Sequence, residues 1–138
     1  MSPFIARSLS LVMVFLLLMS SCEAWFFPKK QTVSITNVLG KGLELTIHCK
    51  SKDDDLGTRE IPFNGNFSFR FRPNFMDTTL FYCNMTWQGQ THGFDIYIAQ
   101  RDKDKCPHNN CSWIIKPTGP CMWNEEKQIY NDCFPWDS

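Results

Sequence analysis

Hydrophobic and polar residues alternate with a period of two along most of the chain that follows residue 30. The alternating runs are 33–39, 43–49, 66–72, 81–88, 94–99 and 112–116. In the third run, Phe67, Phe69 and Phe71 take one face, while Ser68 and Arg70 take the other. Alternation with one apolar face is typical of half-buried antiparallel strands. No segment carries a long amphipathic helical stripe, so the pattern predicts an all-β domain.

Turn-forming residues separate these runs. Gly40–Gly42 lies between the first two, and Gln88–Gly93 makes a tight connection between the fourth and fifth. Asn64-Gly65 is the strongest hairpin signal, because both residues tolerate a positive φ. Pro62 predicts an edge strand, since proline cannot donate a ladder hydrogen bond. Short strands at this spacing favour a sandwich or barrel. We expect a small antiparallel β-sandwich from about Gln31 to Trp123, stapled by disulfides and followed by a C-terminal tail.

The N-terminus carries the features of an export signal. Arg7 precedes an unbroken apolar run, Leu11–Met19, and small residues follow that run. A basic start, an apolar centre and small residues at the cleavage point define a secretory signal peptide. A membrane anchor would need about 20 apolar residues, and this run is much shorter. We expect cleavage after Ala24, which removes residues 1–24 as the signal peptide; cleavage after Ser21 or Cys22 is an alternative. Residues 25–138 should then be secreted to the extracellular space.

Cysteine usage agrees with an oxidising compartment. The chain has seven cysteines, and six remain if Cys22 leaves with the signal peptide. An even number in a short exported domain predicts a disulfide framework. Six cysteines allow 15 pairings, so the sequence alone leaves the pairing open. A zinc site is disfavoured, because the chain has no C-x2-C pair and its three histidines lack ligand spacing. We expect no metal and no cofactor.

Charge and composition exclude two kinds of partner. The 14 basic and 14 acidic residues balance. Nucleic-acid binders normally carry a basic excess, and membrane-active proteins favour a cationic amphipathic surface. We therefore expect no nucleic-acid partner and no membrane insertion. The 12 Phe, 5 Trp and 3 Tyr residues let a short chain bury a large apolar area, and we expect a monomer with a small core.

Three N-x-S/T sequons are candidates for glycosylation: Asn66, Asn84 and Asn110. Period-two alternation places Asn66 opposite the phenylalanine face of its run and Asn84 opposite Cys83, so both should point to solvent. Asn110 is the weaker candidate, because the middle residue of its sequon is Cys111, which can form a disulfide.

Two polar clusters near residue 50 are candidates for chemistry. Asp53-Asp54-Asp55 could hold calcium, but no glycine and distant acidic residue complete an EF-hand loop. A solvated acidic turn is the better interpretation. His48 and Cys49 are adjacent on a strand and point to opposite faces, so they cannot act as base and thiol. Cys49 is better explained as half of a disulfide.

A third polar cluster, Arg101-Asp102 with Asp104, is explained by a solvated strand end. The sequence shows no Ser-His-Asp signature, paired catalytic carboxylates or phosphate loop. We therefore expect no enzyme activity and no catalytic residue.

Several segments, taken in order, resemble one known family. They are Val33–Asn37, Leu45–Gly57, Phe67–Phe71, Thr79–Cys83, Trp87, Phe94–Tyr97, Arg101-Asp102, Cys106 and Trp113–Cys121. The stretch His48–Gly57, followed by Leu-Phe-Tyr-Cys at 80–83, is the most specific part. The chain resembles the plant self-incompatibility S-protein homologue family, whose namesakes are stigma proteins, over nearly all of its mature length.

The resemblance implies a small secreted plant protein with a β-sandwich fold and four characteristic cysteines, which match Cys49, Cys83, Cys106 and Cys121. On that basis we expect the pairs Cys49–Cys121 and Cys83–Cys106. Cys111 and Cys133 are additional to the family pattern, and we expect them to join the late loop to the C-terminal tail.

The resemblance also implies an extracellular ligand. The namesake stigma protein meets a receptor on incompatible pollen, and calcium signalling and growth arrest follow. We expect a signalling-type ligand for a cell-surface receptor in cell–cell recognition or pollen rejection, acting through loops on a rigid scaffold. The candidate loops are Lys50–Arg59, Pro73–Thr78, Gln88–Gly93 and Lys103–Asn110. The alternative is a secreted defence protein acting on microbes or their enzymes.

Overall fold

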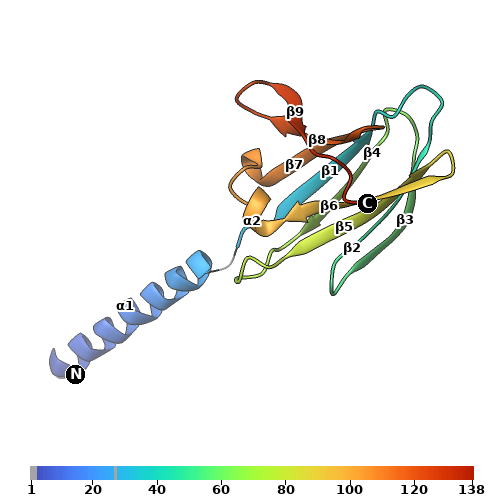
Figure 1. Cartoon of the computed structure of the whole chain (residues 1–138). Coiled ribbons are helices and arrows are strands. Elements are labelled where there is room, and N and C mark those ends of the chain that lie inside the picture. Colours follow the sequence, from blue (N-terminus) through green and yellow to red (C-terminus); the bar gives the residue numbers. More distant parts are fainter. Residues whose placement is uncertain (1–2, 27) are drawn as a thin grey trace.

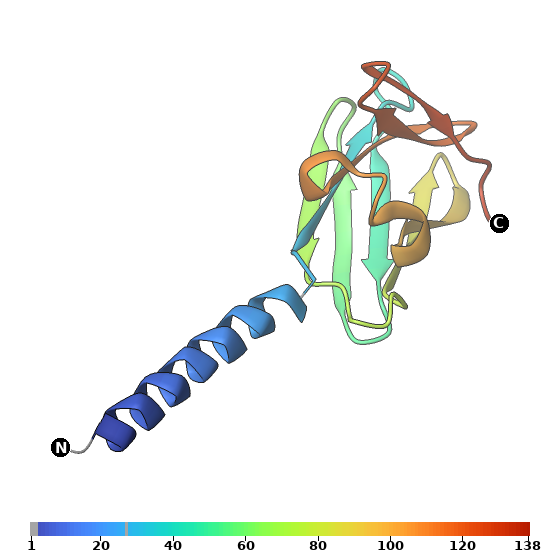
Figure 2. The ribbon, with the colours of Figure 1, turned by 90° about the vertical axis from the view of Figure 1, so that its left-hand side faces the viewer.

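The computed structural model describes residues 3–26 and 28–138, but not the side chains of Phe4 and of residues 19–27. Helix α1 (Pro3–Phe26) contains the expected signal peptide's apolar run and extends away from the rest of the protein (Figures 1 and 2). Its side chains from Ile5 to Leu18 are exposed. Among the described residues, no helix combines the length and apolar content that crossing a membrane requires. Cleavage after Ala24 stays a prediction, and Cys22 lies among the side chains that are not described.

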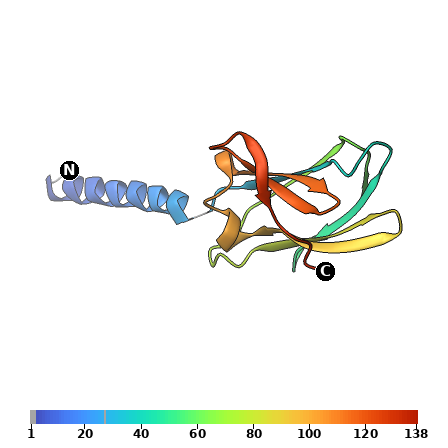
Figure 3. The same cartoon turned by 45° about the horizontal axis from the view of Figure 1, so that its top comes forward.

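Residues 28–138 form two sheets that pack face to face (Figure 3). One sheet has the strand order β4-β1-β7-β8-β9, and the other β3-β2-β5-β6. The strands are β1 (Gln31–Asn37), β2 (Leu45–Lys50), β3 (Asp55–Ile61), β4 (Asn66–Phe71), β5 (Leu80–Trp87), β6 (Gln90–Ile98), β7 (Asn110–Lys116), β8 (Gly119–Asn124) and β9 (Ile129–Cys133). Neighbouring strands are antiparallel except β1 and β7, which are parallel. The predicted disulfide-stapled β-sandwich is confirmed.

Burial follows the predicted alternation. Every second residue of β1, β2, β5 and β7 is buried. Aromatic rings occupy much of the space between the sheets: Phe94 of β6 meets Trp113 of β7 edge-on at 5.2 Å between ring centroids. Phe71 of β4 meets Tyr97 of β6 in the same way at 4.7 Å. Edge-to-face pairs of this kind place the positive ring edge against the negative ring face.

Asn37 is a polar residue on the inward side of β1 and is fully buried. Its side-chain amide donates to the carbonyls of Leu43 at 2.8 Å and Ile61 at 2.9 Å, and its Oδ1 accepts from the backbone N–H of Leu39 at 2.9 Å. A buried amide with its groups satisfied costs little. Because Ile61 ends β3, this side chain ties one sheet to the other.

The Asn64-Gly65 turn is not a hairpin, contrary to the prediction. It joins β3 to β4, which lie in different sheets. Asn64 has φ of 64°, and the N–H of Gly65 donates to the carbonyl of Pro62 at 2.7 Å, so the turn itself forms as expected. The strand before Pro62, β3, is an edge strand, as predicted.

The C-terminal tail is part of the sandwich. Strand β9 pairs with β8, and Phe134 and Trp136 pack against the core. The N–H of Asp137 donates to the carbonyl of Gly93 at 2.9 Å, and Asp137 Oδ2 accepts from the N–H of Asp95 at 2.8 Å. The tail therefore crosses from the edge of one sheet to the edge of the other.

The three predicted disulfide pairs, Cys49–Cys121, Cys83–Cys106 and Cys111–Cys133, are wrong. The structure joins Cys49 to Cys83, Cys106 to Cys111 and Cys121 to Cys133. The first and last pairs lie directly opposite each other on neighbouring antiparallel strands. Cys49 and Cys121 belong to different sheets. Each is bonded to the cysteine that the strand register places opposite it in its own sheet, with the two Cα atoms 4.0 Å apart, so neither is left to bridge the sheets.

Candidate binding surface at one end of the sandwich

Three of the four candidate loops gather at one end of the sandwich, where β1 begins (Figure 1). They follow β2, β4 and β6. Lys50 at the end of β2 pairs with Tyr82 near the start of β5, and Leu80 pairs with Ile98 at the end of β6. Antiparallel pairing therefore brings the loops 51–54, 72–79 and 99–109 together. We call these three loops the loop end.

The fourth candidate loop, Gln88–Gly93, lies elsewhere. Trp87 pairs with Gln90, so the connection is a two-residue turn at the opposite end of β5 and β6. Gln88 and Gly89 have φ of 48° and 74°, as a tight hairpin turn requires. The stretch 90–93 belongs to β6. Likewise, most of Lys50–Arg59 is strand, because β3 begins at Asp55.

Contacts brace the loop end. Lys103 Nζ binds Asp77 Oδ2 at 2.7 Å, which links the loop after β4 to the segment after β6. Asn74 Oδ1 accepts from the backbone N–H groups of Met76 at 3.1 Å and Thr78 at 3.0 Å. The disulfide Cys106–Cys111 closes the loop that contains the short helix η1 (Pro107–Asn109). These contacts link the loop 72–79 to the segment 99–109, whereas the loop 51–54 is closed by its own hydrogen bonds between Ser51 and Asp54.

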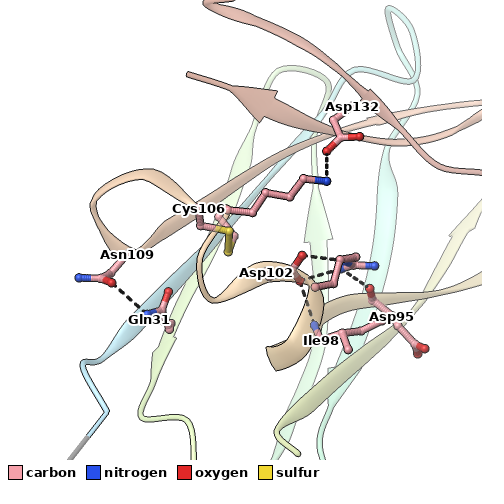
Figure 4. Close-up of a disulfide and its surroundings, with 10 residues drawn as sticks. Gln31, Asp95, Ile98, Asp102, Cys106, Asn109 and Asp132 are labelled. Atoms are coloured by element: carbon pink, nitrogen blue, oxygen red, sulfur yellow. Dashed lines mark hydrogen bonds and ion pairs between the residues drawn. A yellow bond between two sulfur atoms is a disulfide. The ribbon is translucent and has the colours of Figure 1, made fainter. Parts of the chain in front are cut away.

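A buried ion pair anchors the segment after β6, where α2 (Ala99–Asp102) begins. The Arg101 guanidinium donates to Asp102 from Nε at 2.6 Å and from Nη2 at 2.8 Å, and Nη2 also donates to the carbonyl of Asp95. Asp102 Oδ2 accepts from the N–H of Ile98 at 2.9 Å (Figure 4). The expectation of a solvated strand end is wrong here, because Asp102 is 0% exposed. Asp104 is exposed, as expected.

Aromatic rings surround the same guanidinium. Arg101 Cζ lies 5.2–5.4 Å from the ring centroids of Phe94, Trp113 and Phe134. These rings come from β6, from β7 and from the tail, so Arg101 contacts both sheets and the tail. Its side chain is only 19% exposed, and cations over ring faces gain most when water is excluded.

A hollow of about 470 Å³ opens between the first two loops of the loop end. Its wall combines Phe71, Phe81 and Tyr82 with the charged Lys52 and Arg72. Met76 stands nearby in sequence and is 81% exposed. Aromatic rings, methionine and arginine are the residue types enriched where proteins contact other proteins.

The acidic triplet does not converge on a cation site. Asp55 Oδ1 accepts from His48 Nε2 at 2.6 Å and from the N–H of Gly57 at 2.9 Å. The hydrogen bond from Gly57, together with the one from His48, holds the pKa of Asp55 below its ordinary value. Within residues 3–26 and 28–138, no group of three His, Cys, Asp or Glu side chains is placed to hold a metal ion. Asp53 and Asp54 are exposed, as an acidic turn predicts.

Tyr97 is buried beneath the loop end with its hydroxyl unpaired. Its side chain is 0% exposed, and its hydroxyl has no hydrogen-bond partner among the described residues. Burial, with the negative charges of Asp102, Asp77 and Asp104, raises the pKa of Tyr97 to about 12. Its ring packs edge-on to Phe71, so it serves the core that supports the loops.

All three sequon asparagines are exposed. Asn66 lies on β4, where its amide donates to Thr36 Oγ1 at 3.0 Å and its Oδ1 accepts from Ser68 Oγ at 2.8 Å. Asn84 lies on the outer face of β5, opposite His48 and Gly93. Asn110 begins β7, directly before Cys111 of the 106–111 disulfide.

The fold and the loop end define the class: a disulfide-stapled β-sandwich that displays three loops at one end. The chain matches the plant self-incompatibility protein S1 family over residues 32–136 and belongs to that family. Membership confirms the predicted resemblance and the secretion of the chain.

Curated relatives from Arabidopsis thaliana support this assignment. S-protein homolog 3 is 49% identical over 107 residues, covering 76% of this chain and 71% of the relative. S-protein homolog 5 is 46% identical over 110 residues, covering 80% of each. S-protein homolog 2 is 42% identical over 121 residues, covering 86% of this chain and 75% of the relative.

A solved structure has the same fold. It is the structure of a self-incompatibility protein homologue, which is described as a member of a widespread family of small, highly stable, secreted plant proteins. It matches with a TM-score of 0.59 at 19% identity, covering 80% of this chain and 97% of that chain.

Proposed function

We propose that this secreted protein is a signalling ligand that binds a cell-surface receptor on plant cells through its loop end. The observation that carries the proposal is the gathering of three irregular loops on a braced scaffold. Loops held by a rigid framework are where proteins place recognition residues. The family's self-incompatibility name supports a role in cell–cell recognition, of which pollen rejection is one form.

The charge pattern of the loop end favours a protein receptor over a lipid surface. The first two loops of the loop end carry Lys52 and Arg72 together with Asp53 and Asp54. A patch of mixed sign gives specificity by complementarity with a partner, whereas adhesion to anionic lipid needs a basic excess. The second hypothesis is a secreted defence protein acting on microbes or their enzymes, and this charge balance weakens the form of it in which the protein disrupts microbial membranes.

Binding of labelled protein to plant cells tests the proposal. The loop-end variant Lys52→Glu/Met76→Asp changes two exposed side chains, and we expect it to weaken saturable binding at least tenfold. The matched control, Lys41→Glu/Phe63→Asp, changes a lysine and an exposed apolar residue outside the loop end and should bind like the wild type. Equal loss in both variants, or non-saturable binding, would contradict a receptor site at the loop end.

We also propose that the secreted chain is glycosylated at Asn66 and Asn84. Both side chains are exposed, and an exported chain meets the glycosylation machinery. Peptide mapping of protein secreted from plant cells, before and after glycosidase treatment, tests occupancy at each site. Finding both asparagines bare would refute this part of the proposal.

A further inference from the structure

A second hollow, of about 300 Å³, lies beside the 106–111 loop. Asn110 and Ser112 of β7 line one side, and Trp123 and Tyr130 of β8 and β9 line the other. Because Cys111 and Trp113 are fully buried, alternation turns Asn110 and Ser112 to the outer face of the sheet. The hollow is therefore an open site on the outer face of the five-stranded sheet, and its volume suits one small ring system.

The two aromatic side chains of this hollow are fixed in place. Trp123 and Tyr130 meet edge-on, with ring centroids 5.0 Å apart. Trp123 Nε1 donates to Glu125 Oε2 at 2.7 Å, and the hydroxyls of Tyr130 and Ser112 lie 2.7 Å apart. Both rings are half-buried. Fixed, half-buried rings surrounded by hydroxyl, carboxylate and amide groups suit a sugar, whose C–H face can lie on the negative ring face while its hydroxyls reach the polar rim.

Asn110 supplies the means of placing a sugar there, because it starts the sequon Asn110-Cys111-Ser112. Its side chain is exposed and, within residues 28–138, takes part in no hydrogen bond, whereas the amide of Asn66 is bound to Thr36. The carboxylate of Glu125 in the wall disfavours an acidic sugar, while the first sugar of an N-glycan, N-acetylglucosamine, is neutral. We propose that this hollow is the seat of the first sugar of an N-glycan carried by Asn110.

The covalent step uses the secretory pathway's lipid-linked oligosaccharide. Asn110 Nδ2 forms a bond to the anomeric carbon of the donor sugar, and the bond between that carbon and the donor's pyrophosphate oxygen breaks. The electron pair leaves with the pyrophosphate, and the amide nitrogen loses one proton to a base. The amide keeps one N–H, and the sugar attached to it starts beside the rings of Trp123 and Tyr130.

The consequence is that the Asn110 glycan stabilises the fold, whereas a glycan on Asn84 does not. The Asn84 position lies on the other sheet, between His48 and Gly93. Sugar packed on Trp123 and Tyr130 covers apolar ring surface that is otherwise wet. We expect its loss to lower the melting temperature by about 3–6 °C for a domain of this size.

The test uses the full chain secreted from plant cells, with Asn66→Gln/Asn84→Gln so that only the Asn110 sequon remains. Peptide mapping should show Asn110 occupied, and NMR should show contacts between N-acetylglucosamine protons and the rings of Trp123 and Tyr130. Trimming with an endoglycosidase that leaves the first sugar should keep the melting temperature. Adding Asn110→Gln to the Asn66→Gln/Asn84→Gln protein should lower the melting temperature, whereas Asn84→Gln alone in the wild-type chain should leave it unchanged.

A double-mutant cycle distinguishes stabilisation by the contact between sugar and Trp123 from a general stabilising effect of any attached glycan. In Trp123→Ala protein, the difference in melting temperature between the Asn110 and Asn110→Gln forms should vanish. If Trp123→Ala does not fold, the NMR contacts in the parent protein decide the question. A bare Asn110, or an occupied Asn110 without sugar–ring contacts, overturns the proposal. So does an Asn110 that stays bare while the hollow binds free diacetylchitobiose, because the occupant is then a diffusible saccharide.

Discussion

Replacing Asp102 by alanine tests whether the buried ion pair holds the loop end to the sandwich. The substitution leaves the Arg101 guanidinium, which is 19% exposed, without its carboxylate, and it leaves the N–H of Ile98 without its acceptor. Breaking a buried pair by removing one partner costs about 3–5 kcal/mol, because an uncompensated charge stays buried. For a domain of about 100 residues this lowers the melting temperature by roughly 12–20 °C. Urea unfolding followed by tryptophan fluorescence measures the loss.

Two further variants make this test specific. Asp104→Ala removes an exposed carboxylate near the same helix and should change stability by less than about 0.5 kcal/mol. Arg101→Met/Asp102→Asn removes both charges and should cost less than the sum of the single losses, because the two groups are coupled. If Asp102→Ala costs less than about 1 kcal/mol, well under the range for a buried pair, the ion pair does not anchor this segment.

Three more predictions follow from the disulfides and from two titrating groups. Removing the β2–β5 disulfide by a double alanine variant should lower the free energy of unfolding by about 4 kcal/mol, and removing the 106–111 disulfide should lower it by about 2 kcal/mol. The first loss is larger because a longer closed loop restricts the unfolded chain more. Equal losses would contradict this order. Tyr97→Phe removes a buried, unpaired hydroxyl and should stabilise the fold by about 1 kcal/mol at neutral pH. The pKa of Tyr97 rises from 10.0 to about 12 on folding, so the free energy of unfolding of wild type should fall as pH rises through this window. The free energy of unfolding of Tyr97→Phe should fall less over the same range. Identical dependence on alkaline pH in the two proteins would refute the assignment. The pKa of Asp55 is lowered in the folded state by the Gly57 N–H and by His48, so its carboxylate stabilises the fold at pH values above the ordinary carboxyl pKa. The excess in free energy of unfolding of wild type over Asp55→Asn should therefore shrink as pH falls through the folded-state pKa. An excess that grows in acid would contradict this.

The fold was predictable because its main determinant is local. The inward positions of β1, β2, β5 and β7 carry apolar side chains at a spacing of two, and that spacing needs no knowledge of strand partners. Pro62 predicted an edge strand before it, but the alternation did not show the extent of β3, because five of its seven residues are exposed and it has no apolar face. Strand β9 escaped prediction for the same reason, since Ile129 is 52% exposed.

What the sequence could not supply is the pairing of segments that are distant in the chain. The Asn64-Gly65 dipeptide specifies a turn, but only the register of β3 on β2 and of β4 on β1 decides that the turn joins two sheets. The burial of Asp102 was missed for a similar reason. It depends on Trp113 and on the distant Phe134, which contact the side chain of its partner Arg101. A signal was present in principle, because adjacent Arg and Asp beside an aromatic-rich core can form a buried pair.

The placement of the disulfides explains why the Arg101–Asp102 pair matters. One disulfide lies within the four-stranded sheet, one lies within the five-stranded sheet, and one closes the 106–111 loop. None of these three joins the two sheets, whereas the expected Cys49–Cys121 pair would have done so. Cohesion between the sheets therefore rests on the core, on the hydrogen bond from Asn37 to Ile61, and on Arg101 with its three rings. The hydrogen bonds of the tail to Gly93 and Asp95 add to it at the sheet edges. Reduction should loosen each sheet separately, whereas loss of Asp102 should loosen the joint between the sheets at the end where the loops are displayed.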